Sequence, residues 1–396
     1  MIKRINILIV VFIILCSTSF YKLTVLGPAE KVIELAGAGI ILALLILHIV
    51  YGNQKSIKQN FLAPVAIILA SLPFSMLMAK FCRDQTFIQS MFAQRAIYYY
   101  IFYLLLHYLK VRPKDLERIF IVLGLLHVAL YFIQYFLYPK IIFNVFILHG
   151  RGTVRVYLGG AGYLVISYFM SIQAYFRTNK TKYLVLILLF FSIFILLGGR
   201  QTLAIMTFLL ILFVIVDKKV KSKVFNGILI MAAVVTAFFM FQGIIEQLIL
   251  QSLHDKSQGE DYIRILAYKY FLSDFYKCPL AYITGNGTAA NHTAYSRELG
   301  RLAATRGYYL SDIGLAGNYV AYGVLFLIGV LTICIKALRI KIEKQYDYFK
   351  YMFISIVLAL PIGRAFAVAD FICFISLAMY IFDVSINRLK TSALTN

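Results

Sequence analysis

The chain has 396 residues; 62% of them are hydrophobic, 14% are charged, and the mean hydropathy is +0.83. Soluble domains are roughly 45–50% apolar, so the composition excludes an ordinary soluble enzyme and predicts a protein that crosses a membrane several times. The long apolar runs exclude a transmembrane β-barrel, whose strands alternate apolar and polar residues. The formal charge of +22 does not indicate nucleic-acid binding, because lysines and arginines collect in the loops of membrane proteins and set their orientation.

Apolar runs of about 15–20 residues recur along the chain and predict about twelve transmembrane helices. The first run has no convincing small-residue cleavage site, so we interpret it as a span rather than a signal peptide. We expect an all-α polytopic fold with spans one to nine in 1–243, a large external loop in 244–312, and three spans and a cytoplasmic tail in 313–396. The predicted spans are 5–21, 32–51, 61–80, 96–109, 119–138, 161–176, 183–199, 202–216, 224–243, 313–338, 351–363 and 366–384.

The basic residues predict the orientation of these helices. If the N-terminus is cytoplasmic and the spans alternate, 22 of the 39 Lys and Arg residues lie inside and 17 lie outside, seven of them in the long loop. Long loops carry little weight in the positive-inside rule. The short loops therefore favour cytoplasmic N- and C-termini and an external long loop.

Lysine and arginine are divided unequally between the two sides. Lysines outnumber arginines 16 to 6 inside, whereas arginines outnumber lysines 10 to 7 outside. Orientation requires only positive charge, but a guanidinium also binds phosphate oxygens through two parallel hydrogen bonds. The outer arginines therefore predict an external site for a phosphate or pyrophosphate, with salt bridges and lipid headgroups as the alternative for part of them.

The five cysteines show no disulfide framework. Cys82 and Cys278 lie in predicted external loops, where a disulfide between them is possible, but we expect all five to be unpaired. No CxxC or similar ligand spacing is present, and no external acidic cluster stands out. The sequence therefore predicts no metal site and no cofactor.

Two short external segments hold candidate anion-binding arginines. Arg151 and Arg155 lie in the segment 149–162, whose glycines let backbone N–H groups approach an anion; an ordinary turn with small-residue helix packing is the alternative. Arg200 follows two glycines in a link of almost no length between two spans. An ionisable group at that depth is a functional candidate, with snorkelling to the headgroups as the alternative.

The long loop holds further candidates. Apolar residues in 260–276 recur at helical spacing, with Arg264 beside the apolar stripe, and Arg306 lies in a charged stretch before the chain re-enters the membrane. His292 is a candidate general base because an imidazole titrates near neutrality. Asp312 is the alternative base, although it could instead cap the next helix.

Later spans also contain ionisable groups. Arg364 and Asp370 lie at membrane depth, where they could pair with each other through the bundle. We interpret His48, His107 and His127 as packing residues.

Four places in the chain resemble the O-antigen polymerase and ligase superfamily. Arg264 opens a helix that leads to Cys278-Pro279-Leu280 and Gly285-Asn286-Gly287, similar to the family's Arg-helix-Pro-Leu-Gly-x-Gly stretch. Ser-Asp-Ile-Gly-Leu-Ala-Gly at 311–317, with Tyr322-Gly323, resembles its membrane re-entry motif. Gly199-Arg200 and the arginines at 151 and 155 lie where the family also carries arginine. The ligases typically carry His-Asn before the re-entry glycine, where this chain reads Ala303-Ala304-Thr305-Arg306, which favours a polymerase.

The resemblance implies a metal-independent glycosyltransferase of the bacterial plasma (inner) membrane, a polymerase of O-antigen or capsular polysaccharide. It would transfer a glycan chain from undecaprenyl pyrophosphate to a lipid-linked repeat unit. For this reaction we expect Arg155, Arg200 and Arg264, followed by Arg151 and Arg306, to bind the pyrophosphate, and His292 or Asp312 to act as the base.

The implied partners are the undecaprenyl-pyrophosphate-linked oligosaccharide, membrane lipid, a flippase and a chain-length regulator, with no nucleic acid. An O-antigen ligase shares nearly all of these features. A lipid-linked oligosaccharide flippase or other transporter is the competing class, but the repeated halves and short external loops typical of transporters are not seen in the sequence.

Overall fold

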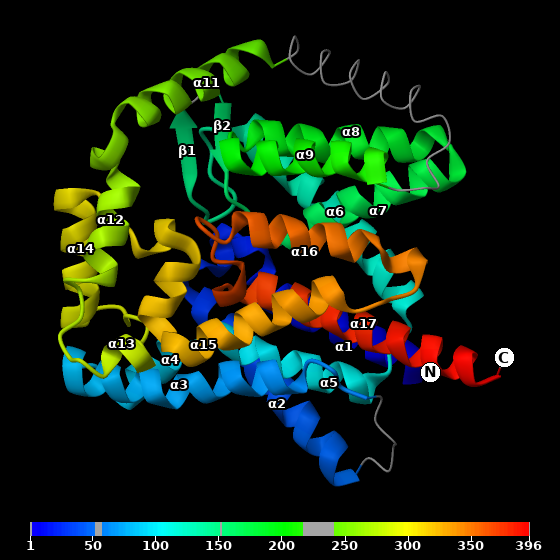
Figure 1. Ribbon diagram of the computed structural model, residues 1–396, viewed down its shortest axis with the longest axis horizontal. Helices are drawn as coiled ribbons and strands as arrows, with labels where there is room; N and C mark the ends of the chain where they lie inside the picture. The colour runs from blue at the N-terminus through cyan, green and yellow to red at the C-terminus, as the bar shows by residue number, and fades with distance from the viewer. Residues whose placement is uncertain (1, 52–57, 151–152, 217–240, 396) are drawn as a thin grey trace.

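The computed structural model describes residues 2–51, 58–150, 153–216 and 241–395. Most of the predicted ninth span and the candidate Arg151 lie outside these residues. Figure 1 shows that many of the long helices run side by side along one axis. The helices are α1 (Ile2–Ser17), α2 (Glu30–Tyr51), α3 (Leu62–Arg83), α4 (Phe87–Ala93), α5 (Ile101–Leu109), α6 (Pro113–Leu137), α7 (Ala161–Thr178), α8 (Thr181–Leu196), α9 (Arg200–Val216), α11 (Gln242–Ser257), α12 (Ile263–Leu272), α13 (Ala281–Thr284), α14 (Ala294–Arg306), α15 (Gly314–Arg339), α16 (Tyr348–Ala359) and α17 (Ala369–Thr395).

Described helices cover most of each of the other eleven predicted segments. The boundaries differ where hydropathy alone misses the end of a helix. α3 continues to Arg83, and α6 begins at Pro113, because proline at the first helical position lacks only an N–H that would have no intrahelical partner. The segment predicted at 96–109 consists of a 3₁₀ stretch, Arg95–Tyr100, followed by α5.

Five helical segments within the described residues are long and apolar enough to cross a membrane. They are Glu30–Tyr51, Leu62–Arg83, Pro113–Leu137, Leu310–Arg339 and Ala369–Ser392. Most of α1, and the whole of α8 and α9, are apolar but shorter. The protein is therefore a helical membrane protein, and the total of about twelve spans stays a prediction.

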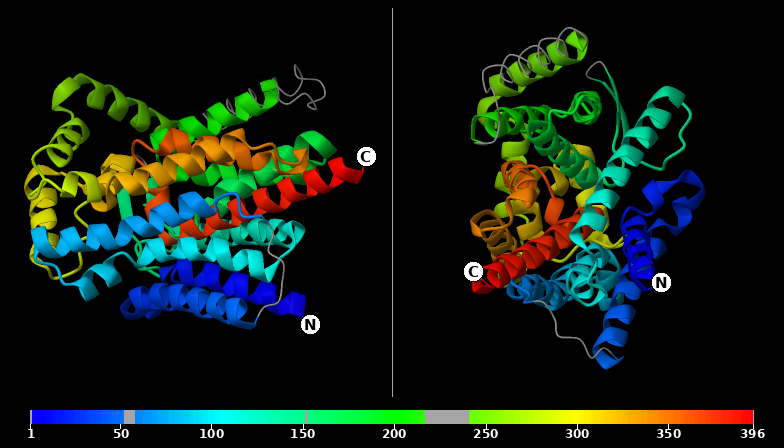
Figure 2. Two further views of the ribbon diagram at one scale, coloured as in Figure 1. Left: turned by 60° about the horizontal axis from the view of Figure 1, so that its bottom comes forward. Right: turned by 90° about the vertical axis from the view of Figure 1, so that its right-hand side faces the viewer.

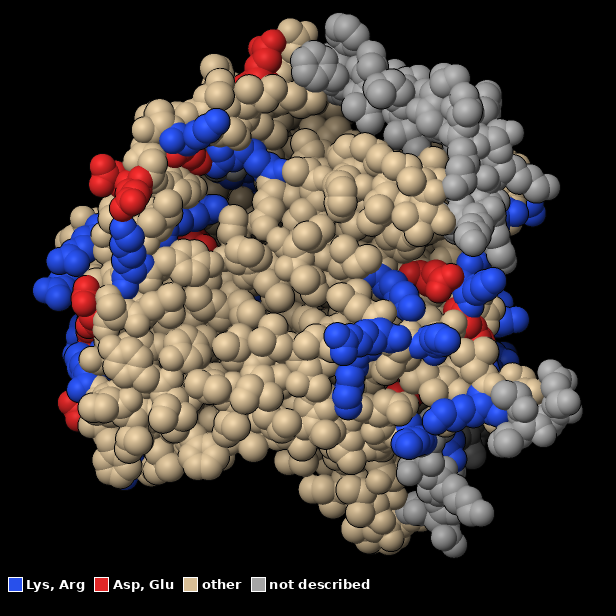
Figure 3. All heavy atoms as spheres, in the orientation of Figure 1, with Lys and Arg blue, Asp and Glu red and all other residues tan. Residues whose placement is uncertain are grey.

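Both chain termini lie at one end of the bundle, and α12, α13 and α14 lie at the opposite end (Figure 1 and Figure 2). Charged side chains gather toward the two ends, with a largely uncharged face between them (Figure 3). Ion pairs form within each end of the bundle: Arg388 pairs with Glu343 at one end, and Lys277 pairs with Glu298 at the other. Contacts of the basic residues thus join segments that the sequence assigns to the same side of the membrane.

A small β-hairpin departs from the predicted all-α fold. β1 (Ile147–Gly150) and β2 (Thr153–Val156) pair antiparallel, with Ile147 opposite Val156. Three of the four residues of β2 are β-branched, which favours a strand. The segment for which a turn was one alternative thus contains two paired strands, and it leads into α7.

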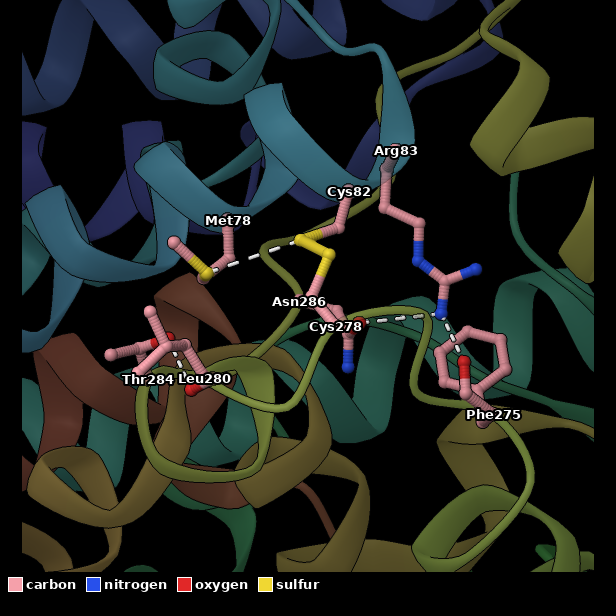
Figure 4. Close-up of a disulfide and its surroundings, with 8 residues drawn as sticks. All are labelled: Met78, Cys82, Arg83, Phe275, Cys278, Leu280, Thr284 and Asn286. Atoms are coloured by element: carbon pink, nitrogen blue, oxygen red, sulfur yellow. Dashed lines mark hydrogen bonds between the residues drawn. A yellow bond between two sulfur atoms is a disulfide. The ribbon is translucent and has the colours of Figure 1, made fainter.

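Cys82 and Cys278 form a disulfide, so the prediction that all five cysteines are unpaired is wrong for these two (Figure 4). Their Cα atoms lie 6.0 Å apart although 196 positions separate them in the sequence. The pairing was missed because only the folded chain brings the end of α3 against the loop after α12. The remaining three cysteines are free and buried, as predicted.

Arg83, the last residue of α3, fastens the same two segments together through its buried side chain (Figure 4). One terminal nitrogen lies 3.1 and 3.0 Å from the two carboxylate oxygens of Glu298 in α14. The other donates to Phe275 O and, at 3.3 Å, to Asn286 Oδ1. The guanidinium also lies 4.1 Å from the ring centroid of Phe275 and 4.9 Å from that of Tyr295. Arg83, which the sequence assigned to the outer side, therefore serves the fold.

Two glycines let the chain after α13 contact the backbone of α15. Gly285 and Gly323 both have positive φ angles. A Cβ on Gly323 would lie 2.2 Å from Ile283 O, and one on Gly285 would lie 2.5 Å from Ala321 O. Only glycine permits backbones to approach this closely in this conformation. Two of the sequences that carry the family resemblance thus contact each other directly.

A buried polar network lies nearer the termini. Asp383 of α17 accepts hydrogen bonds from the Tyr103 hydroxyl at 2.5 Å and from Asn60 Nδ2 at 2.7 Å. Nε2 of His107 lies 3.1 Å from the same carboxylate. His107 is buried as predicted, but it joins a polar network rather than packing alone.

Candidate functional site

A cavity of about 1010 Å³ lies near the end of the bundle opposite the termini. The polar residues of its wall come from the turn after α1, the start of α2, the 3₁₀ stretch that follows α4, the residues before α14, and the segment 363–370 that leads into α17. Another part of the wall is apolar and includes Phe194 of α8, Met206 of α9 and Met352 of α16. The cavity therefore offers both polar and apolar surface to one ligand.

The polar wall carries more positive than negative charge. Four basic side chains and two carboxylates line the cavity, and such an excess in a low-dielectric cleft attracts anions. These residues are Lys22, Lys31, Arg95, Arg364, Glu34 and Asp370.

The two arginines of the cavity are held by different partners. Nε of Arg95 lies 2.7 Å from Glu34 Oε2. Nε of Arg364 donates to Asn318 Oδ1 at 2.9 Å, and no other polar partner of Arg364 occurs within the described residues. Arg364 therefore keeps its two terminal amino groups for a ligand, in the arrangement that suits bidentate contact with phosphate oxygens.

Arg364 and Asp370 do not pair with each other, so that prediction is wrong. Asp370 Oδ2 instead accepts a hydrogen bond from the N–H of Gly160. Asp370 lies in the first turn of α17, where exposed backbone N–H groups stabilise a carboxylate. The preceding carbonyl, that of Gly159, lies 3.1 Å from His127 Nδ1.

None of the six predicted site residues that the structure describes lines the cavity itself. These residues are Arg155, Arg200, Arg264, His292, Arg306 and Asp312. Arg155 lies on β2, and its Nη1 is 3.3 Å from the hydroxyl of Tyr157, a cavity residue. Its Cδ lies 2.9 Å from where a Cβ on Gly198 would be, so its side chain packs against that glycine. Arg155 thus borders the cavity.

Arg200, at the start of α9, is engaged by α11. Its terminal nitrogens donate to Ser252 Oγ at 3.0 Å and to Asp255 Oδ2 at 2.5 Å. Burial alone would raise the pKa of Asp255, but the hydrogen bond and charge of Arg200 outweigh it and hold that pKa below its ordinary value. Arg200 therefore serves an ion pair between helices, while its neighbour Gly199 lines the cavity.

Arg264 and Arg306 lie on α12 and α14, and the structure does not bring them to the cavity. Arg306 is exposed, with its guanidinium 5.5 Å from the ring centroid of Tyr270. Arg264 is partly exposed on a helix whose Ala267 and Phe271 are buried. The predicted amphipathic helix is confirmed, in the shorter range of α12.

The two predicted bases also lie outside the cavity wall. His292 is exposed, with a φ angle of +63°, whereas the four residues before it, 288–291, line the cavity. Asp312 accepts a hydrogen bond from Ser311 Oγ at 3.2 Å. Its side chain does not cap α15, so the capping alternative is wrong.

The sequence matches no protein-family model, and it matches no curated protein at a significant level. The cavity and the sequence patterns therefore provide the indications of function.

Sequence reasoning did not assign Arg95 or Lys22 to the site, and it treated Arg364 only as a candidate partner for Asp370. The available signal was the excess of arginine on the outer side, which includes both cavity arginines. Neither arginine was predicted to bind an anion, because the predicted anion-binding arginines lie in the glycine-rich segments and in the long loop. Arg364 also follows a glycine, but it was assigned to a span border.

Proposed function

We propose that this protein is a glycan polymerase that acts at the external face of a bacterial plasma membrane. It transfers a growing chain from undecaprenyl pyrophosphate to a sugar hydroxyl of a lipid-linked repeat unit. The observation that carries the proposal is the cavity with excess positive charge, at the end of a membrane-embedded bundle opposite both termini. The family resemblance at the glycine and arginine motifs points to the same chemistry.

The leaving group of this reaction is a pyrophosphate, so the protein must mainly stabilise its negative charge. Arg364 and Arg95 provide guanidinium groups in the cavity, and Lys22 and Lys31 add positive charge; Lys22 also lies 3.9 Å from Glu30 Oε2. Arg155 borders the site and can extend it. This arrangement stabilises the leaving group without assigning that role to a metal ion.

The apolar part of the wall suits the polyprenyl chain. Phe194, Met206 and Met352 come from three helices, α8, α9 and α16. A ligand with an anionic head and a long hydrocarbon tail can place both parts in one cavity, because the polar and apolar surfaces adjoin. A free sugar nucleotide would leave the apolar surface unused.

The disulfide supports the proposed orientation. Disulfides persist in oxidising compartments and are rare in the cytosol, and Cys82 and Cys278 lie at the end of the bundle that carries α12 to α14. We therefore assign that end to the outside and the termini to the cytoplasm. About twelve spans, with the loop segment (residues 242–313) as an external cover of the site, complete the proposed architecture.

The decisive experiment incubates the purified protein with an undecaprenyl-pyrophosphate-linked repeat unit. A ladder of products supports a polymerase. Transfer of a single unit to a different acceptor would identify a ligase, and translocation in vesicles without new glycosidic bonds would identify a transporter. The ladder should persist in the presence of a chelator.

Arg364 offers a direct test of the pyrophosphate site. Arg364→Lys keeps the charge but loses the bidentate geometry, so we expect turnover to fall about 100-fold, the magnitude typical for removing one preorganised charge-stabilising donor. Arg301→Lys, on the exposed face of α14, is the matched control. Equal turnover of the two variants would remove Arg364 from the proposed site.

A further inference from the structure

One peptide group in the cavity region lies between two titratable side chains. The carbonyl of Gly159 accepts a hydrogen bond from His127 Nδ1, and the N–H of Gly160, in the same peptide unit, donates to Asp370 Oδ2. Both side chains line the cavity. Because a carbonyl oxygen can only accept, Nδ1 of His127 carries a proton. The peptide thus fixes the positions of His127 and Asp370 relative to the cavity.

The second oxygen of Asp370 is unusual. The residue is 6% exposed. Backbone N–H groups of Asp370 and Phe371 at the start of α17 act on the carboxylate, but Oδ1 forms no hydrogen bond of good geometry within the described part of the chain. Leaving a buried acceptor unsatisfied costs about 1–3 kcal/mol, and more for a charged group. A ligand hydroxyl in the cavity would remove that cost.

We propose that Asp370 is the general base of the transfer reaction, an inference that rests on the polymerase function above. Oδ2 stays bonded to Gly160, and Oδ1 takes the proton of the acceptor hydroxyl as that oxygen bonds to the anomeric carbon of the donor. The bond from this carbon to the pyrophosphate oxygen breaks, and its electron pair leaves with polyprenyl pyrophosphate, held by Arg95 and Arg364. The proton passes to solvent when the product leaves.

Other acidic or imidazole groups are less suited to this role. Glu34 lines the cavity but already pairs with Arg95 at 2.7 Å. His292 and Asp312 do not line it. Among the described residues, the charged and titratable groups that interact with Asp370 include Lys22, Glu34, Tyr21, Tyr163 and Cys373. His127 lies on the other side of the Gly159–Gly160 peptide and donates its Nδ1 proton to it.

Asp370→Asn tests the proposal because asparagine keeps a carbonyl oxygen for the N–H of Gly160 but cannot accept a proton at the catalytic pH. We expect kcat to fall 100- to 10,000-fold, the usual contribution of a general base, with KM for the lipid-linked donor changed less than about threefold. The acid limb of the kcat profile should also disappear. Asp274→Asn, at an exposed position of the loop segment, is the matched control.

The outcomes separate this inference from the proposed function. If wild-type protein makes no glycosidic bond from the lipid-linked repeat unit, the polymerase proposal fails. If wild type polymerises and Asp370→Asn keeps its rate and pH profile, only the role of Asp370 is overturned. His127→Gln abolishing turnover while Asp370→Asn does not would likewise overturn it.

A second variant covers the case in which Asp370→Asn does not fold. Asp370→Ala leaves space in the cavity for a small carboxylate, and added formate should restore a measurable part of the turnover. A structural role would not respond to formate, so folded Asp370→Ala without rescue would overturn the proposal.

Discussion

Replacing Arg83 with methionine is expected to loosen the loop segment from the end of α3. The side chain of Arg83 is 0% exposed and that of Glu298 is 21% exposed. Breaking a buried ion pair by removing one partner costs about 3–5 kcal/mol. Lys277 still lies 2.9 Å from Glu298 in the variant, and methionine refills part of the space between two rings, so we expect about 3 kcal/mol. This corresponds to about 100-fold in the equilibrium between attached and detached loop segment.

Hydrogen exchange of the α14 amides in detergent measures this equilibrium directly. Exchange should be about 100-fold faster in Arg83→Met than in wild type, because local opening exposes these amides. Lys80→Met is the matched control: Lys80 belongs to the same last turns of α3 but is exposed, with Nζ 4.7 Å from the Phe87 ring centroid. Its α14 exchange should stay at the wild-type rate.

Two results would contradict this reasoning about Arg83. The first is exchange in Arg83→Met within about threefold of the Lys80→Met control. The second is a double-mutant cycle with Glu298→Gln in which the two changes add, because residues in direct contact should show a coupling energy of about 0.5–3 kcal/mol.

Three further predictions concern the same end of the molecule. Burial alone would raise the pKa of Glu298, but the hydrogen bond from Lys277 and the charge of Arg83 hold that pKa below its usual value. The contribution of Glu298 to stability is therefore complete above about pH 4.5, and it is lost as the pH falls through the lowered pKa. Hydrogen exchange of the α14 amides, measured as a function of pH, tests this prediction. Gly323→Ala should destabilise the folded protein by at least about 3 kcal/mol, because the new Cβ would overlap backbone atoms. Gly300→Ala has open space around it and should stabilise the fold by up to about 1 kcal/mol. Thermal unfolding of the two variants measures both effects. Cys278→Ser should weaken the attachment of the loop segment by about 2–4 kcal/mol and leave the rest folded, so unchanged exchange around α12 would refute a tethering role.

Much of the helical framework could be predicted from hydropathy. Each apolar run reports a local property, the burial of side chains in lipid or in the bundle, so segments such as Leu62–Arg83 and Pro113–Leu137 are visible without any knowledge of their neighbours. The hairpin at 147–156 is too short for this signal. The hairpin is favoured by its β-branched residues and by the pairing of the two strands. Only the β-branched residues can be read from the local sequence.

The candidate site could be predicted only in part, because it depends on contacts between distant segments. The sequence drew attention to the arginines that it assigned to the outer side, but it could not tell how each one is used. Arg83 forms an ion pair with Glu298, and Arg200 forms one with Asp255. Arg364 lines the cavity instead. An arginine looks the same in sequence whether a carboxylate from another helix neutralises it or not.

The position of Cys82 and Arg83 has a consequence for biosynthesis. Both residues leave the ribosome well before their partners in the loop segment: Cys278 follows Cys82 by 196 positions. During this interval α3 is made, but the thiol has no disulfide partner and the guanidinium has no carboxylate from Glu298. This end of the bundle can therefore be completed only after most of the helices have been made, and a chain that stops before α14 would carry an unpaired thiol at Cys82 and an unneutralised guanidinium at Arg83.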